Sequence, residues 1–227
     1  MKNNYIDFSR HFGSNGPNAY FSFCDEDYSS IVNRKKFVSK LGYNPKDLVI
    51  SSQVHSNKIK LVDKPCSVED FDGLISKSRS VVLSILVADC MPLFLYNPIS
   101  KYFALIHSGW RGTDKNICQS AISKLINKGD NSNALLAIIG PSIGQCCFEV
   151  GAEVASKFDS SYSIKGKKDK MMLNLRAVLK DQLIRSGVKA NNIFLNKQCT
   201  YCESELFHSY RREGSSAGRM IAICGWN

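Results

Sequence analysis

The apolar residues of this chain fall into short runs that are separated by polar turns or by turns containing glycine and proline. The run at 81–88 is nearly continuous, which predicts a strand buried on both faces. The runs at 93–96 and 102–106 flank the turn-forming segment Asn97-Pro98-Ile99-Ser100-Lys101 and predict a hairpin. Further strands are predicted at 48–54, 59–62, 134–139, 193–195 and 220–224.

Helical spacing predicts four helices, at 25–42, 117–126, 149–158 and 171–185. In the first, Asp25 or Asp27 would cap the start, and Gly42 would end the helix. Its buried stripe would consist of Ile31, Val32, Phe37, Val38 and Leu41. Residues 165–170 have the character of a loop. Strands and helices mix without regular alternation, repeat or clean linker, so we expect one mixed α/β (α+β) domain over residues 1–227 rather than a doubly wound sheet.

Composition and charge narrow the class of protein. The 227 residues carry a formal net charge of +10, which would suit a non-enzymatic nucleic-acid-binding module. However, the lysines are scattered, and aromatic residues are not interleaved with the basic ones, so we do not expect a nucleic-acid partner.

The cysteines and the apolar runs indicate a compartment. The chain has nine cysteines, an odd number, and its first residues contain no apolar signal region. No run approaches the ~18 apolar residues of a membrane span. We therefore expect a cytoplasmic protein with free or metal-bound thiols and no membrane partner.

Three residues carry the strongest chemical signal: His55, Cys90 and His107 each follow or close an apolar run. Two imidazoles and a thiolate are a ligand set that zinc accepts, leaving a fourth position open for water or substrate. The sequence gaps are long and match no short zinc motif, and a cysteine and two histidines at strand ends are more often structural. The flanking residues therefore decide how this set is interpreted.

The residues next to Cys90 and His107 favour a functional site over a purely structural role. Asp89 precedes Cys90 and would orient a ligand or act as an acid or base, and Pro92 would end the strand ladder next to it. The segment Ser108-Gly109-Trp110-Arg111-Gly112 reads as a tight turn whose glycines permit unusual backbone angles. It leads into a helix whose N-terminus would favour an anion, and Arg111 would add a forked contact to phosphate.

Two clusters near the C-terminus give weaker signals. Arg211, Arg212 and Arg219 lie near glycines and could bind an anion, although such a segment is more often a solvated loop. Cys199-Thr200-Tyr201-Cys202 has C-x-x-C spacing, but without a second pair at a matching interval we do not expect a structural zinc ribbon, while a redox pair stays open. We expect Cys146 and Cys147 to be buried small hydrophobes, and His208 to be a packing or surface residue.

Several linked motifs of this chain resemble a known family. They are Gln53-Val54-His55, Ala88-Asp89-Cys90-Met91-Pro92, His107-Ser108-Gly109-Trp110-Arg111-Gly112, Gly140-Pro141-Ser142-Ile143 and Ser209-Tyr210-Arg211-Arg212. In this order they resemble the laccase-domain family, first described as multicopper polyphenol oxidases and later as purine nucleoside phosphorylases, which includes a peptidoglycan editing factor. Ser56 and Ser108 depart from the glycine and alanine common in the family, and the glycine-rich N-terminal segment is matched only loosely at 12–16.

The resemblance implies a mixed α/β laccase-domain fold of the cytotoxic-necrotizing-factor-like type, with central sheets flanked by helices. It implies metal ligands at His55, Cys90 and His107. The implied activities are phosphorolysis of purine nucleosides, phosphorolysis of methylthioadenosine and deamination of adenosine, with purine nucleosides and phosphate as partners. Only 4 histidines are present, too few for a multicopper centre, so we expect zinc rather than copper.

For these reactions we expect catalytic roles for Cys90, Asp89 and His107. The phosphate-binding candidates are Arg111, Arg211 and Arg34, and Gln53 of the first motif is a further substrate-binding candidate. Two enzymatic alternatives stay open. In one, His107 or His55 activates Cys90 as the nucleophile of a cysteine hydrolase; in the other, the enzyme edits peptidoglycan precursors by amide hydrolysis.

Overall fold

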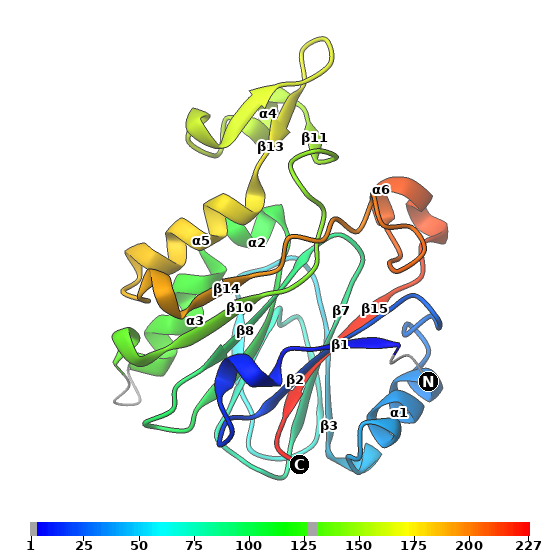
Figure 1. Ribbon diagram of the computed structural model, residues 1–227, viewed down its shortest axis with the longest axis vertical. Coiled ribbons are helices and arrows are strands. Elements are labelled where there is room, and N and C mark those ends of the chain that lie inside the picture. Colours follow the sequence, from blue (N-terminus) through cyan, green and yellow to red (C-terminus); the bar gives the residue numbers. More distant parts are fainter. Residues whose placement is uncertain (1–3, 127–130) are drawn as a thin grey trace.

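The computed structural model describes residues 4–126 and 131–227 and shows a mixed α/β protein built on two six-stranded sheets (Figure 1). The first sheet has the order β1-β2-β15-β7-β3-β5 and combines antiparallel with parallel pairs. Its strands are β1 (Tyr5–Asp7), β2 (Asn18–Ser22), β15 (Met220–Gly225), β7 (Val82–Val87), β3 (Leu48–Ser52) and β5 (Ser67–Glu69). The mixed α/β class expected from the sequence is confirmed.

The second sheet has the order β14-β10-β8-β9-β6-β4 and is also mixed. Its strands are β14 (Ile193–Leu195), β10 (Leu136–Ile139), β8 (Met91–Tyr96), β9 (Phe103–Ser108), β6 (Gly73–Ser76) and β4 (Ile59–Leu61). A small third sheet joins β11 (Glu149–Val150), β13 (Met171–Leu173) and β12 (Ser163–Lys165), and it projects from the main body at the top of Figure 1.

The helices are α1 (Ile31–Lys40), α2 (Trp110–Asp114), α3 (Ile117–Ile126), α4 (Ala152–Ala155), α5 (Leu175–Arg185) and α6 (Tyr210–Glu213). Helix α1 covers the outer face of the first sheet, helices α3 and α5 cover that of the second, and the remaining three of these helices are short. Short 3₁₀ helices lie at Ser9–Phe12, Pro45–Asp47, Ser132–Ala134, Ser160–Tyr162, Ala190–Asn192 and Gly214–Ser216. No helix in the described part of the chain is long and apolar enough to cross a membrane.

Alternation along each strand distributes its side chains between two cores. In β8, Leu93 and Leu95 pack toward α3 and α5, whereas Phe94 and Tyr96 pack between the two sheets. In β15, Ile221 and Ile223 instead face the α1 side. The layers are therefore α1, first sheet, second sheet, and α3 with α5. Strands buried on both faces explain why the central apolar runs are nearly continuous.

Several sequence predictions are confirmed. Helix α3 has the bounds predicted from the sequence, 117–126. The strand predicted at 81–88 is β7, which is buried along most of its length. The hairpin is β8–β9, in antiparallel register from Met91↔Ser108 to Tyr96↔Phe103. The predicted strands at 48–54, 59–62, 134–139, 193–195 and 220–224 correspond to β3, β4, β10, β14 and β15 within a few residues at each end.

The helix predicted at 25–42 is shorter than expected. Helix α1 begins at Ile31, because Asp27 does not cap it and instead accepts hydrogen bonds from the backbone N–H groups of Ser29 and Arg219 at 2.9 Å each. Ile31 and Val32 are 41% and 55% exposed, so the prediction that these two residues belong to a buried stripe was wrong. Phe37 and Val38 are buried as expected.

The two helices predicted after residue 148 are replaced partly by strands. Of the segment 149–158, Glu149–Val150 forms β11 and only Ala152–Ala155 is α-helical. Met171–Leu173 forms β13, and α5 begins only after Asn174, whose side chain accepts a hydrogen bond from the Ala177 N–H. Residues 165–170 do form a turn, between β12 and β13. The tertiary pairing of these strands overrides the local helical spacing.

Apart from β11 and β13, the strands that the sequence pattern did not predict are β1, β2, β5, β6 and β12, each of five residues or fewer. Pro92 was expected to end the strand ladder, and this was wrong: it lies inside β8, paired with His107, and its carbonyl accepts from the Gly140 N–H at 2.9 Å. Proline lacks the N–H that would donate a ladder hydrogen bond, but its carbonyl still accepts one, so the strand continues through Pro92.

Candidate active site

The structure brings His55, Cys90 and His107 together where the two sheets meet. His55 follows β3 of the first sheet, and His107 lies in β9 of the second. Cys90 lies in the connection that carries the chain from β7 to β8. Their ligand atoms all lie within 4.8 Å of one another, with Cys90 Sγ 3.9 Å from His55 Nε2. Residues far apart in sequence thus form one metal-binding geometry.

Asp72, a residue that the sequence did not single out, organises both histidines. Its carboxylate is fully buried just before β6. Oδ1 accepts from His107 Nδ1 at 2.8 Å and from the His55 N–H at 3.0 Å. Oδ2 accepts from the backbone N–H groups of Val54 and Ser56, at 3.2 and 2.6 Å, and from Ser56 Oγ at 2.8 Å. Ser56 therefore contributes a hydroxyl as well as an N–H to this network.

Because Nδ1 is hydrogen-bonded to Asp72, Nε2 is the nitrogen that His107 can offer to a metal ion. A carboxylate behind a histidine in this way is the usual support of a metal-bound imidazole. No short-range sequence signal marks Asp72, since it lies within the segment Glu69-Asp70-Phe71-Asp72 and the partners of its carboxylate are supplied by two other segments.

The protonation states of the cluster are perturbed by mutual contact. Burial raises the pKa of Cys90, but the charge of His107 and hydrogen bonds from His107 and His55 outweigh it and lower the pKa to about 6. Burial lowers the pKa of His107, but the thiolate of Cys90 and the carboxylate of Asp72 raise it to about 9. Burial likewise opposes ionisation of Asp72, but hydrogen bonds from His107 and Ser56 lower its pKa to about 2. Cys90 is therefore poised as a thiolate.

The backbone at the cluster is unusual at two residues. His55 and Asp89 have φ angles of +58° and +83°, in the left-handed region that non-glycine residues rarely adopt. Each costs of the order of 1–3 kcal/mol and persists only where surrounding contacts fix it. Here the Asp72 carboxylate fixes the His55 loop through three backbone N–H groups.

Gly109 serves the cluster by its lack of a side chain. Its φ of −82° is ordinary, so the expectation of an unusual backbone angle is wrong at this glycine. A Cβ placed there would lie 2.8 Å from Cys90 Sγ and 3.0 Å from His55 Cδ2. Helix α2, which begins at Trp110, has only five residues, so it provides little of the helix-terminal field that was expected to favour an anion.

One cavity of about 870 Å³ contains the cluster and the residues expected to act in catalysis or to bind substrate and phosphate. This volume lies in the range of small-molecule binding sites. The predicted residues that line the cavity are Arg34, Gln53, His55, Asp89, Cys90, His107, Arg111 and Arg211. Trp110, Phe148 and Tyr210 contribute aromatic surface, and Arg219 adds a fourth arginine.

The arginines are held differently. Arg111 lies over the Trp110 ring at 4.3 Å, and Arg211 lies over the Phe148 ring at 5.4 Å while donating to the Glu149 carbonyl at 2.6 Å. Arg34 is anchored by bonds to the carbonyls of Tyr28 and Ser29. The guanidinium of Arg212, in contrast, donates hydrogen bonds to the carbonyls of Thr200, Tyr201 and Phe207. Arg212 does not line the cavity.

Gln53 and Asp89 line the cavity but also have structural partners. The Gln53 amide pairs with the backbone of Leu86, donating to its carbonyl and accepting from its N–H at 2.7 Å each. The Asp89 carboxylate accepts from Thr200 Oγ1 and from the Arg211 N–H, both at 2.6 Å. Each side chain therefore joins the cavity wall to a neighbouring segment.

The two remaining histidines lie elsewhere. His11 stacks on Phe194 with ring centroids 3.8 Å apart, and His208 lies 3.6 Å from Glu213. His208 is thus a packing residue, as expected. In the described part of the chain, the His/Cys groupings capable of holding a metal are the cluster above and a second set of four cysteines.

Comparison with known proteins now identifies the family. Residues 9–227 match the family described as multi-copper polyphenol oxidoreductase laccase. The chain belongs to this family. The laccase-domain chain is 30% identical to adenosine deaminase RL5 from an unknown prokaryotic organism, over 91% of this chain and 87% of that protein. It is 31% identical to purine nucleoside phosphorylase YfiH of Shigella flexneri, over 88% of this chain and 82% of the relative.

A solved structure supports the fold of this laccase-domain chain. The crystal structure of hypothetical protein YfiH from Bacillus licheniformis superposes with a TM-score of 0.88, at 27% identity and 93% coverage of both chains. The resemblance drawn from the linked motifs is therefore confirmed, as is the fold it implied.

Proposed function

We propose that this laccase-domain chain is a zinc-dependent purine nucleoside phosphorylase that also deaminates adenosine and cleaves methylthioadenosine. The observation that supports this most directly is a single cavity in which the His55–Cys90–His107 cluster, four arginines and three aromatic side chains face one another. The names of the relatives, a purine nucleoside phosphorylase and an adenosine deaminase, agree with this chemistry.

The donor set fits zinc. Two imidazoles and a thiolate converge within 4.8 Å, Asp72 holds the His107 ring through its Nδ1, and Gly109 keeps space free beside the sulfur. His55, Cys90 and His107 would hold the ion, which when bound lowers the pKa of a coordinated water or polarises a substrate oxygen. A multicopper centre would need more histidines than the two at this site.

The other residues would bind and orient the substrates. Arg111 and Arg211 carry forked donors that suit phosphate, and Arg34 and Arg219 add positive charge to the same cavity. Trp110, Phe148 and Tyr210 provide surfaces on which a purine ring can pack. Both oxygens of Asp89 already accept hydrogen bonds, from Thr200 and from Arg211, so we assign it first a positioning role and second an acid–base role.

A cysteine hydrolase remains the second candidate, because Cys90, His107 and Asp72 also form a nucleophile–base–carboxylate arrangement. The low pKa of Cys90 suits both a metal ligand and a nucleophile. The amide bond of a peptidoglycan precursor is the substrate class that the family resemblance provides for this reading.

All nine cysteines are free, which agrees with the cytoplasmic location that we propose.

Phosphorolysis is tested by following phosphate-dependent conversion of inosine to hypoxanthine and ribose 1-phosphate. We expect Cys90→Ala to lose both the activity and the zinc held with His55 and His107. The variant Cys66→Ala, at an exposed cysteine, should keep both. Arg111→Ala should raise the KM for phosphate about ten- to a hundred-fold, since a hydrogen bond to a charged group contributes about 1.5–3 kcal/mol. Arg111→Lys should recover part of this loss.

The cysteine-hydrolase reading makes the opposite prediction. If activity survives chelation of all zinc and disappears when metal-free enzyme is alkylated at Cys90, Cys90 is a nucleophile rather than a ligand. If Cys90→Ala cleaves inosine at the wild-type rate, the phosphorylase site proposed here is wrong.

A further inference from the structure

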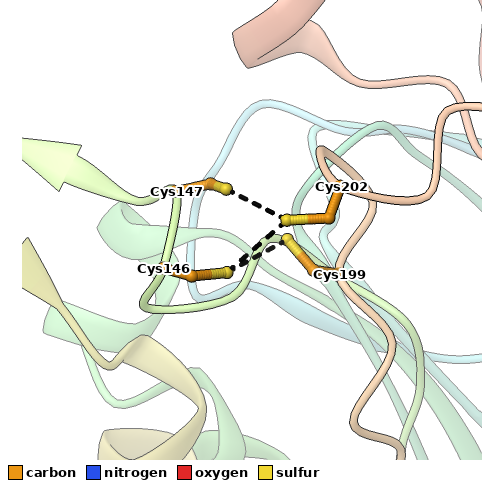
Figure 2. Close-up of side chains that lie close together, drawn as sticks. All are labelled: Cys146, Cys147, Cys199 and Cys202. Atoms are coloured by element: carbon orange, nitrogen blue, oxygen red, sulfur yellow. Dashed lines mark hydrogen bonds between the residues drawn. The ribbon is translucent and has the colours of Figure 1, made fainter.

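Four cysteines from two distant segments converge outside the cavity. Cys146 and Cys147 lie in the loop between β10 and β11, and Cys199 and Cys202 lie in the segment that follows β14 (Figure 2). All four Sγ atoms lie within 4.8 Å of one another. The expectation that Cys146 and Cys147 are buried hydrophobes is wrong, since Cys146 is exposed and Cys147 is partly exposed. The C-x-x-C pair has a partner pair that linear spacing could not reveal.

The sulfur geometry resembles a tetrahedral metal site. Cys146 Sγ lies 3.7 Å from the sulfurs of both Cys199 and Cys202, and Cys147 Sγ lies 3.3 Å from that of Cys202. Four sulfurs around zinc, with Zn–S bonds of about 2.3 Å, are separated by about 3.8 Å along the edges of the tetrahedron. A disulfide would join sulfurs in exclusive pairs, whereas Cys146 and Cys202 each have two close sulfur neighbours.

The two loops are shaped to present these thiols. Gly144 donates its N–H to Cys199 Sγ at 3.2 Å, and its carbonyl accepts from the N–H groups of Cys147 and Phe148. A Cβ on Gly144 would lie 3.1 Å from Cys146 Sγ. On the other loop, the Glu203 N–H bonds to the Cys199 carbonyl and closes the C-x-x-C turn. A glycine beside the sulfurs and an N–H···S bond are features of a thiolate site rather than of an apolar contact.

Arg176 of α5 supports both loops from the inside. This buried guanidinium donates to Ser142 Oγ at 2.8 Å and to the Lys197 carbonyl at 3.0 Å, and it also bonds the carbonyls of Ser142 and Gln198. Ser142 and Cys199 further form a parallel bridge. A zinc ion with four thiolates carries net negative charge, which a buried cation close by would offset.

We propose that Cys146, Cys147, Cys199 and Cys202 bind a second zinc ion, which is structural and independent of the one in the active site. Four thiolates complete the tetrahedron and leave no open position, as in structural zinc sites. The ion fastens together two loops that are more than fifty residues apart in the chain.

This second site would also stiffen one wall of the active-site cavity. Thr200, within the C-x-x-C turn, donates to Asp89 beside Cys90. Phe148 and Glu149, directly after Cys147, contact Arg211. Losing the second zinc should therefore loosen the wall that holds Asp89 and Arg211 without removing any ligand of the first metal.

The test is metal analysis of the purified full-length protein and of single variants. We expect two zinc ions per chain in wild type, one in Cys202→Ser, one in Cys90→Ala and two in the exposed control Cys66→Ser. In Cys90→Ala loaded with cobalt(II), the remaining site should show the intense charge-transfer bands of tetrathiolate cobalt. Those bands should be lost in the Cys90→Ala, Cys202→Ser double variant.

A second measurement uses wild type and does not depend on folding of a variant. Cys146, Cys147 and Cys202 should resist alkylation when zinc is bound and react after chelation, whereas Cys66 should react equally in both states. The proposal is overturned if wild type binds one zinc that Cys90→Ala removes, if the four cysteines are isolated as disulfides, or if the site holds iron. It is also overturned if the exposed thiols of Cys146 and Cys202 are alkylated at the same rate with and without zinc.

Discussion

Replacing Asp72 by asparagine should separate the role of the buried carboxylate from that of the ligands themselves. The substitution keeps the shape of the side chain but turns one acceptor oxygen into a donor. Oδ1 serves the His55 N–H and His107 Nδ1, and Oδ2 serves three donors from Val54 and Ser56. In its better orientation the amide nitrogen replaces Oδ1, so at least two buried donors lose their acceptor.

The magnitude follows from that count. Each unsatisfied buried donor costs about 1–3 kcal/mol, so Asp72→Asn should destabilise the metal-free protein by about 2–6 kcal/mol. Loss of the carboxylate behind a metal-bound histidine typically weakens metal binding by about ten- to a hundred-fold. Ser56→Ala removes a single hydroxyl donor to the same carboxylate and should cost only about 1 kcal/mol.

The assays are urea unfolding of metal-free protein and zinc titration in competition with a chelator. Asp70→Asn is the matched control, because it makes the same chemical change two residues away at an exposed position whose φ of +61° asparagine tolerates. If Asp72→Asn unfolds at the same urea concentration as Asp70→Asn and binds zinc with wild-type affinity, the organising role assigned to Asp72 is refuted.

Two further changes test the surroundings of the sites. Gly109→Ala keeps an allowed φ but places Cβ 2.8 Å from Cys90 Sγ. Overpacking of about 1–3 kcal/mol should weaken zinc binding at the first site about ten- to a hundred-fold. Unchanged zinc affinity in the chelator competition would contradict this steric argument. Arg176→Met leaves Ser142 Oγ and the carbonyls of Lys197 and Gln198 without their buried donor and should lower stability by about 3 kcal/mol or more in urea unfolding, whereas Arg185→Met, exposed on the same helix, should change it little.

Local pattern predicted the central elements well and the peripheral ones poorly. Strands β7, β8 and β9 bury most of their side chains and helix α3 buries one apolar face, so their patterns carry a strong signal. Segments 149–158 and 171–185 have helical spacing, yet their first residues pair as β11 and β13. Such pairing depends on which segments meet in space, and no local window of sequence contains that information.

The sequence by itself singled out His55, Cys90 and His107 as candidate ligands, the arginines that accompany them and the family to which the chain belongs. Those residues lie in short motifs that follow one another in a fixed order along the chain, so the linked set could be recognised from the sequence although no single motif is specific. Only the tertiary structure placed Asp72 behind both histidines and brought Cys146 and Cys147 to the C-x-x-C pair. The physical reason is that each of these groups acts through partners on other segments, and only the packing of the two sheets and their connecting loops brings such partners within bonding distance.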